Sequence, residues 1–144
     1  MPDFPNLCIR GIQKAKHVHT DTDTVSSLLF IPDNRTRELR SDGGDETSIN
    51  WEDNDSVLEF TLDSKDENNP TSLAFPHGAV KLPRKILDEV VNSPTTYDSI
   101  KYERQELPHN PFHGNIVFRA GLPNHTITMI ANVFAYSCSK VLRK

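Results

Sequence analysis

The sequence predicts an α+β domain, in which an antiparallel, meander-like sheet carries one short helix and a long C-terminal helix packed on it. Two patterns indicate this class. Short runs of β-branched and large apolar residues recur over residues 7–119 and are separated by turn residues, as β-strands are. Residues 125–142 instead repeat apolar positions at spacings of three and four, the period of a helix. A length of 144 residues predicts a single domain over residues 1–144.

The first half of the chain is predicted to be mostly β-structure. Residues 7–12 form a short apolar run that we expect at the edge of the sheet. Residues 25–31 are dense in β-branched and large apolar side chains, which favours a central strand, and residues 47–51 form a brief strand ending at the only tryptophan. Within residues 57–62, apolar and polar positions alternate, which predicts a half-buried strand with one wet face.

The second half mixes strands with helices. Further strands are predicted at residues 73–82, 100–106 and 115–119. Pro83 suits a first helical turn, and the apolar edge after it predicts a helix through Val91.

The last predicted helix has apolar side chains on two sides. Asn124 is expected to cap it. One face, which should pack on the sheet, carries Ile127, Ala131, Phe134, Cys138 and Val141. A second run lies on roughly the opposite side and consists of Met129, Val133 and Tyr136. Because an ordinary surface helix has one apolar stripe, we predict that this second run binds another protein or a second copy of the chain.

Charge is unevenly distributed. Residues 42–69 contain ten acidic residues and one lysine, in a chain whose net charge is −4. We expect this region to include a mobile acidic loop that keeps the protein in solution; the alternatives are a surface for a basic partner or a flap over the protein's own basic face. Such an acidic segment argues against nucleic-acid binding.

The sequence predicts a cytoplasmic protein. No apolar run approaches the roughly 18 residues that a membrane span needs, and the N-terminus lacks the basic start and apolar centre of a signal peptide. Cys8 and Cys138 have neither CxxC spacing nor a disulfide-rich context, so we expect buried, reduced thiols.

Residues 17–23 place His17, His19, Asp21 and Asp23 at alternate positions. On a strand all four would point to one face, and a His-x-His pair is a metal-ligand geometry. Together with Gly11, the pattern resembles the first metal motif of cupins, although an aspartate replaces the expected glutamate. The competing interpretation is a polar edge strand with solvated histidines.

A second histidine pair is His109 and His113. Pro111 between them excludes a regular helix, so a rigid loop entering a strand is predicted, with His113 hydrogen-bonding that loop. If a metal is bound, the ligand set to test is His17, His19, His109 and His113.

No nucleophile elbow, zinc-protease motif, phosphate-binding P-loop or dinucleotide fingerprint is present in the sequence. The closest match to a phosphate-binding cluster is Arg35, Arg37 and Arg40, which lacks interleaved aromatic residues. We therefore expect no cofactor and favour a protein that is not an enzyme.

Two short segments, residues 48–51 (Ser-Ile-Asn-Trp) and residues 110–117 (Asn-Pro-Phe-His-Gly-Asn-Ile-Val), resemble segments of small uncharacterised prokaryotic accessory proteins. The resemblance carries over no catalytic residue and implies a component of a multi-gene, defence-type system. The leading hypothesis is a non-enzymatic accessory or adaptor protein that binds another protein. The alternative is a metal-binding protein or metal-dependent enzyme built on the clustered histidines.

Overall fold

A computed structural model of the chain describes residues 4–32 and 40–144. Its helices are α1 (Val57–Asp63), α2 (Arg84–Asn92) and α3 (Asn124–Ser137), with the 3-10 helices η1 (Ala15–His17) and η2 (Ser27–Leu29). Its strands are β1 (Leu7–Gly11), β2 (Val18–His19), β3 (Thr24–Val25), β4 (Asp45–Trp51), β5 (Ala79–Pro83), β6 (Ile100–Arg104) and β7 (His113–Phe118).

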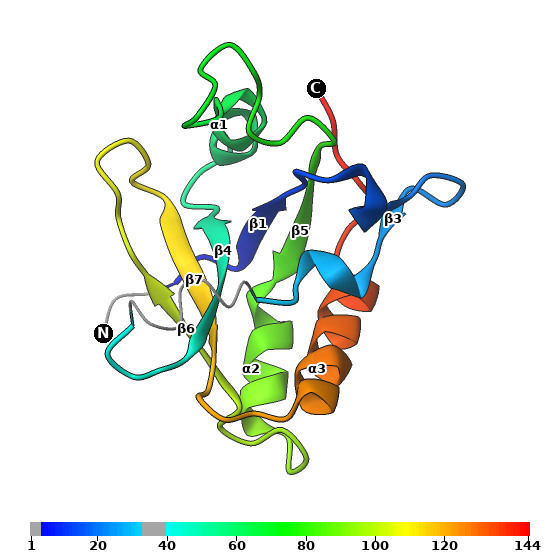
Figure 1. The fold of residues 1–144 in the computed structure, drawn as a ribbon, viewed down its shortest axis with the longest axis vertical. Coiled ribbons are helices and arrows are strands. Elements are labelled where there is room, and N and C mark those ends of the chain that lie inside the picture. The colour runs from blue at the N-terminus through cyan, green and yellow to red at the C-terminus, as the bar shows by residue number, and fades with distance from the viewer. Residues whose placement is uncertain (1–3, 33–39) are drawn as a thin grey trace.

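The main sheet has five strands in the order β5-β1-β4-β7-β6, and every neighbouring pair is antiparallel. The predicted antiparallel α+β class is thereby confirmed. Strands β6 and β7 are neighbours in the sheet and form a hairpin (Figure 1). The connections from β4 to β5 and from β5 to β6 instead join strands that are not neighbours in the sheet. The expectation that residues 7–12 form an edge strand is wrong, because β1 lies between β5 and β4. A separate two-stranded unit pairs β2 with β3.

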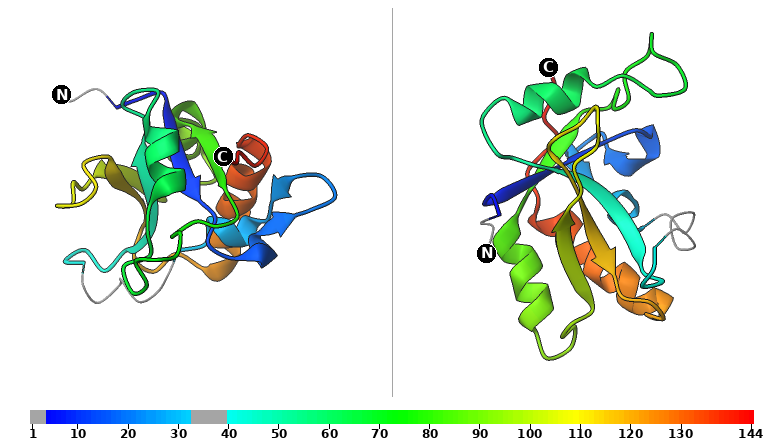
Figure 2. Two further views of the ribbon diagram at one scale, coloured as in Figure 1. Left: turned by 90° about the horizontal axis from the view of Figure 1, so that it is seen from above. Right: turned by 90° about the vertical axis from the view of Figure 1, so that its left-hand side faces the viewer.

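Helices cover both faces of the sheet. Helices α2 and α3 lie side by side and, together with η2, enclose the larger hydrophobic core against one face (Figures 1 and 2). Helix α1 closes a smaller cluster at the other face, near β1 and β5. Successive residues of β1 contribute to opposite faces, with Cys8 in the larger core and Ile9 in the smaller cluster, as the pleat of a strand requires.

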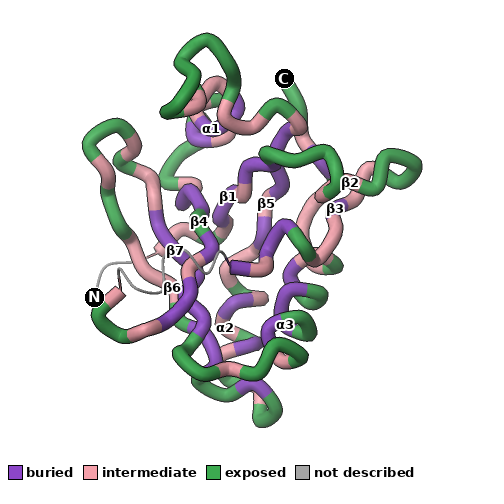
Figure 3. Tube along the Cα trace, in the orientation of Figure 1, coloured by how far each residue is buried: buried purple, intermediate pink, exposed green. Residues whose placement is uncertain are grey.

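Helix α3 is confirmed, but it is shorter than predicted. Ile127, Ile130, Ala131 and Phe134 are buried, whereas the outer side of the helix is exposed (Figure 3). The helix ends at Ser137, because the following residues hydrogen-bond to the edge of β5 instead, and Leu142 forms a β-bridge with Ala79. Asn124 is the first helical residue rather than the cap; Pro123 occupies the cap position and supplies no side-chain hydrogen bond.

The strand predicted over residues 57–62 is wrong, since these residues form α1. The buried residues are Val57 and, four and five positions later, Thr61 and Leu62. This spacing puts them on one side of a two-turn helix, and that side faces the sheet. The side chain of Asn54 accepts a hydrogen bond from the Ser56 N–H and stabilises a turn just before the helix. A seven-residue run is too short to distinguish the two-residue period of a strand from the 3.6-residue period of a helix, so packing against the sheet decided between them.

The central strand predicted over residues 25–31 is also wrong. Only Val25 belongs to a strand, and η2 follows it. The Ser26 hydroxyl accepts a hydrogen bond from the Leu28 N–H, which caps this 3-10 turn. Leu29 and Phe30 are still buried, so the apolar content of the run serves the core without a ladder of backbone hydrogen bonds.

The acidic range of residues 42–69 is not one continuous loop. It contains all of β4 and α1, so the loop parts are residues 42–44, 52–56 and 64–69. Their mobility stays a prediction. Likewise, the strand predicted over residues 73–82 begins only at Ala79, after a turn at Gly78 whose φ is +102°.

Across the part of the chain that the structure describes, no helix combines the length and the hydrophobicity needed to cross a membrane.

Candidate functional site

The outer side of α3 carries the predicted partner-binding residues. Met129 is 43% exposed, Val133 is 40% exposed and Tyr136 is 94% exposed. The accessibility expected of this second apolar run is confirmed, while the binding of a partner stays a prediction. We call these three side chains the α3 surface.

Helix α3 contains no Asp, Glu, Lys or Arg, although 25% of the whole chain is charged. Its buried side needs no charge, but its exposed side would ordinarily carry some. Cores of protein interfaces are depleted of charged residues and enriched in methionine and tyrosine. The composition of the α3 surface therefore resembles the centre of an interface.

A groove of about 980 Å³ runs beside the α3 surface, between α3 and the β2–β3 unit. Val133 and Tyr136 line it from the helix, and Thr24 and Val25 line it from β3. No carboxylate lines this groove within the described residues; its only cationic side chain is Lys140. The groove is thus suited to an uncharged segment of a partner.

The predicted metal ligands lie in two separate places. His17 ends η1 and His19 belongs to β2, whereas His109 and His113 lie in and after the loop that joins β6 to β7, on the other side of the molecule (Figure 1). Within residues 4–32 and 40–144, no group of three or more His, Cys, Asp or Glu side chains is arranged to hold a metal ion. The proposed single set of four histidines is therefore not assembled.

Residues 17–23 do not form the single strand that would align their side chains. They run from η1 through β2 into a turn, where Asp23 has a φ of +57°. Asp23 forms an ion pair with Arg143 at 2.8 Å, a contact between the β2–β3 turn and the C-terminal tail. The metal motif suggested by the alternating sequence is thus lost to a local turn.

His113 is held by the loop as expected. Its Nδ1 lies 3.0 Å from the backbone oxygen of Gln105. A carbonyl only accepts, so Nδ1 carries the proton and Nε2 is left as an acceptor in the neutral ring. Burial lowers the pKa of His113, which keeps the neutral form at pH 7. The pKa of His17 is lowered as well, by burial and then by the positive charge of Arg10.

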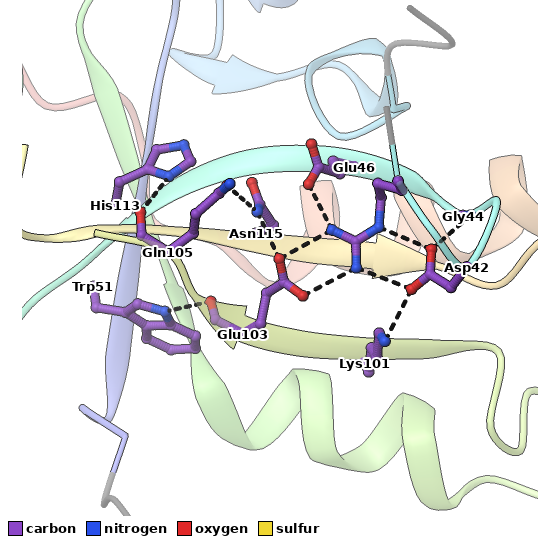
Figure 4. A network of polar contacts seen from close by, with 10 residues as sticks. Asp42, Gly44, Glu46, Trp51, Lys101, Glu103, Gln105, His113 and Asn115 are labelled. Atoms are coloured by element: carbon purple, nitrogen blue, oxygen red, sulfur yellow. Dashed lines mark hydrogen bonds and ion pairs between the residues drawn. The ribbon is translucent and has the colours of Figure 1, made fainter. Parts of the chain in front are cut away.

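Arg40 is the centre of an ion-pair network. Its guanidinium contacts Asp42 at 3.0 Å, Glu46 at 2.6 Å and Glu103 at 3.0 Å. Figure 4 shows these carboxylates converging from β4, from β6 and from the loop that precedes β4, with Lys101 reaching Asp42. The guanidinium holds the pKa of Asp42 and of Glu103 below their usual ranges.

This network bears on the arginine cluster that was the closest sequence match to a phosphate-binding site, and it argues against a phosphate at Arg40. Three carboxylates already neutralise its charge, so an anion would have to displace one of them. Arg35 and Arg37, the other members of that predicted cluster, lie outside the described residues. The network instead fastens the segment before β4 to the sheet.

Asn115 of β7 extends the network into the sheet. Its Nδ2 donates to Glu103 at 2.9 Å and to the side chain of Gln105 at 2.8 Å, and the residue is fully buried. Sequence reasoning missed Glu103 and Asn115, because their partners depend on the pairing of β6 with β7. Arg10 was also missed, although a charge inside an otherwise apolar strand was a signal that could have drawn attention to it.

The thiols are free, as expected. Cys8 is buried and Cys138 is half-buried. Burial raises the pKa of Cys8 to about 12 and that of Cys138 to about 11. Both sulfurs are therefore protonated and weakly nucleophilic at neutral pH, which makes covalent catalysis by either cysteine unfavourable.

The chain matches no protein-family model, no curated protein and no solved structure.

Proposed function

We propose that this protein is a non-enzymatic accessory protein that binds another protein through the α3 surface. The observation that carries the proposal is the exposure of Met129, Val133 and Tyr136 on a helix without charged side chains. Leaving such side chains in water is unfavourable, and burying them against a partner recovers roughly 25 cal/mol for each Å² of apolar area.

The groove beside the helix supports the same role. Val133 and Tyr136 of α3 line it together with Val25 of β3 and Lys140, so a partner could contact α3 and the β2–β3 unit at once. The expected partner presents an apolar segment without a buried charge, because nothing on this surface except Lys140 would neutralise one. The resemblance of residues 48–51 and 110–117 to prokaryotic accessory proteins is the basis for placing this role within a multi-gene defence system.

The partner can be identified by site-specific crosslinking in the native host. A photo-crosslinking amino acid replaces Tyr136 in one variant and Tyr97 in a matched control, since Tyr97 is 71% exposed but lies in the loop between α2 and β6. The protein that crosslinks from position 136 alone is then purified, and its affinity for the wild-type chain is measured by calorimetry.

The double variant Met129→Asp with Val133→Asp then tests the surface. We expect it to keep the wild-type melting temperature and to bind the identified partner at least tenfold more weakly, whereas Tyr97→Asp should bind normally. Binding that is unchanged in the double variant would refute the proposal. Sedimentation that showed only a homodimer, dissociated by the same double variant, would replace the adaptor role by self-association.

A further inference from the structure

A second cavity, remote from the α3 surface, lies where β1 and β4 separate. It has a volume of about 470 Å³ and is bounded by α1, by the loop after α1 and by the loop between β6 and β7. Small-molecule sites typically occupy roughly 300–1,000 Å³. Its apolar lining residues include Ile9, Phe60 and Phe75, and its polar ones include Arg10, Asn50 and His113.

Arg10 is held at the gap between the two strands. Strand β1 pairs with β5 over its whole length, but it pairs with β4 only at Cys8 and Ile9. Beyond that point the Arg10 side chain spans the gap, with Nη1 donating to the Ser48 oxygen at 2.9 Å and Nε donating to the Leu29 oxygen at 3.1 Å. Two backbone carbonyls thus hold the guanidinium in place.

Arg10 carries its charge without an ion-pair partner among residues 4–32 and 40–144. Among the described residues no carboxylate forms an ion pair with it, in contrast to Arg40, which contacts three. Burial lowers the pKa of Arg10 to about 10, so it remains protonated at neutral pH. Its remaining N–H groups form a planar fork that matches the two oxygens of a carboxylate.

Two acidic residues, Asp66 and Glu67, line the cavity, and each is engaged with another residue of the protein. Glu67 lies 3.2 Å from Nε2 of His109, and both side chains are exposed. Asp66 accepts a hydrogen bond from the Asn68 N–H within its own loop. An anion entering the cavity would meet Arg10 without displacing a carboxylate from it.

Hydrogen bonds within the protein hold the polar lining residues together. Asn110 donates to Asn50 at 2.8 Å, and Asn50 donates to Thr61 at 2.8 Å. This chain of hydrogen bonds connects the β6–β7 loop, β4 and α1. His113 lines the same cavity with its Nδ1 committed to Gln105, so its Nε2 is the ring atom left to accept a hydrogen bond.

We propose that this cavity binds a small organic acid with an apolar body. The carboxylate pairs with the free edge of the Arg10 guanidinium, and the body packs against Phe60 and Phe75. A hydroxyl or amine on the ligand would donate to Nε2 of His113. The proposal does not depend on the α3 surface, because the two sites share no residue.

Benzoate is a suitable first probe, and benzamide is its uncharged counterpart of nearly the same shape. Each is titrated into isotope-labelled full-length protein while the Arg10 Nε–H, the Asn50 and Asn110 amides and the His113 ring are followed by NMR. We expect saturable shifts at these groups with benzoate and at least tenfold weaker binding of benzamide. Equal responses to the two compounds, no saturable response to benzoate, or a response to inorganic phosphate as strong as that to benzoate would overturn the proposal.

Two variants test the geometry. Arg10→Lys keeps the positive charge but loses the planar fork, and it should weaken benzoate binding at least tenfold. Ala74→Phe fills the cavity from a lining position without altering Arg10, so it decides the question even if Arg10→Lys fails to fold. The control Arg119→Gln removes an exposed guanidinium outside the cavity and should bind benzoate normally. Full benzoate affinity in folded Ala74→Phe would refute the site.

Discussion

Replacing Phe134 by alanine should destabilise the protein by about 3–5 kcal/mol, as the largest core truncations do. The side chain is completely buried, and its ring packs edge-on against Phe30 with the centroids 5.8 Å apart. Burial of a phenylalanine side chain contributes about 1.5–3 kcal/mol, and an aromatic pair of this geometry adds about 0.5–1.5 kcal/mol. The cavity left behind by incomplete relaxation accounts for the rest.

Tyr136→Ala is the matched control on the same helix. Tyr136 is almost fully exposed, so its removal should change the free energy of unfolding by no more than about 0.5 kcal/mol. The two variants share a host helix and remove aromatic rings of similar size. Burial alone distinguishes them.

Urea unfolding measures both effects, with the fluorescence of Trp51 as the reporter. Trp51 is the only tryptophan and is fully buried, so its emission should change on unfolding. With a slope of about 2 kcal/mol per molar urea, Phe134→Ala should lower the midpoint by roughly 2 M and leave the slope unchanged. A loss below about 1 kcal/mol, or an equal loss in Tyr136→Ala, would show that α3 does not pack on the sheet through this face.

Three further predictions concern charge, pH and metal. Arg40→Met should lower the free energy of unfolding by about 1–3 kcal/mol at pH 7, because it leaves charged partners unsatisfied. This loss should shrink as the pH falls below 4.5, where Glu103 is protonated in the unfolded chain. A loss that does not vary with pH would contradict this. Burial lowers the pKa of His113 below its usual 6.5, so the contribution of His113 to stability should fall as the pH drops from 7 to 5.5. The melting temperature of His113→Asn should therefore vary less over that range than the melting temperature of the wild type. A chelator should leave the melting temperature unchanged; a decrease that disappears when His17 and His19 are both replaced by alanine would restore the metal hypothesis.

The periodic parts of the sequence predicted their own structure. The start of α2 after Pro83 and the Ile127, Ala131 and Phe134 part of the buried stripe follow from local spacing, and the structure confirms them. Cys138 and Val141, the rest of that stripe, lie beyond the end of the helix. Strands β4, β6 and β7 also lie within a few residues of their expected places. The accessibility of Met129, Val133 and Tyr136 followed from the same period, because a helix places residues three and four apart on one side.

Short apolar runs were ambiguous for a physical reason. In α1 and in residues 25–31, too few residues are present to separate a period of 2 from one of 3.6. Burial against β1 and β5 selected a helix in the first case. In the second, a serine cap and the packing of Leu29 and Phe30 beneath α3 selected a 3-10 turn.

The partners of the charged residues were set only by the tertiary structure. Arg40 meets Glu103 across 63 positions of sequence, and Arg10 meets Ser48 across 38. Composition identified these residues as charged, but the sheet order determined that carboxylates neutralise Arg40, whereas the partners of Arg10 among the described residues are backbone carbonyls. Local sequence specifies backbone periodicity, whereas the environment of a charge depends on which distant strands the fold brings beside it.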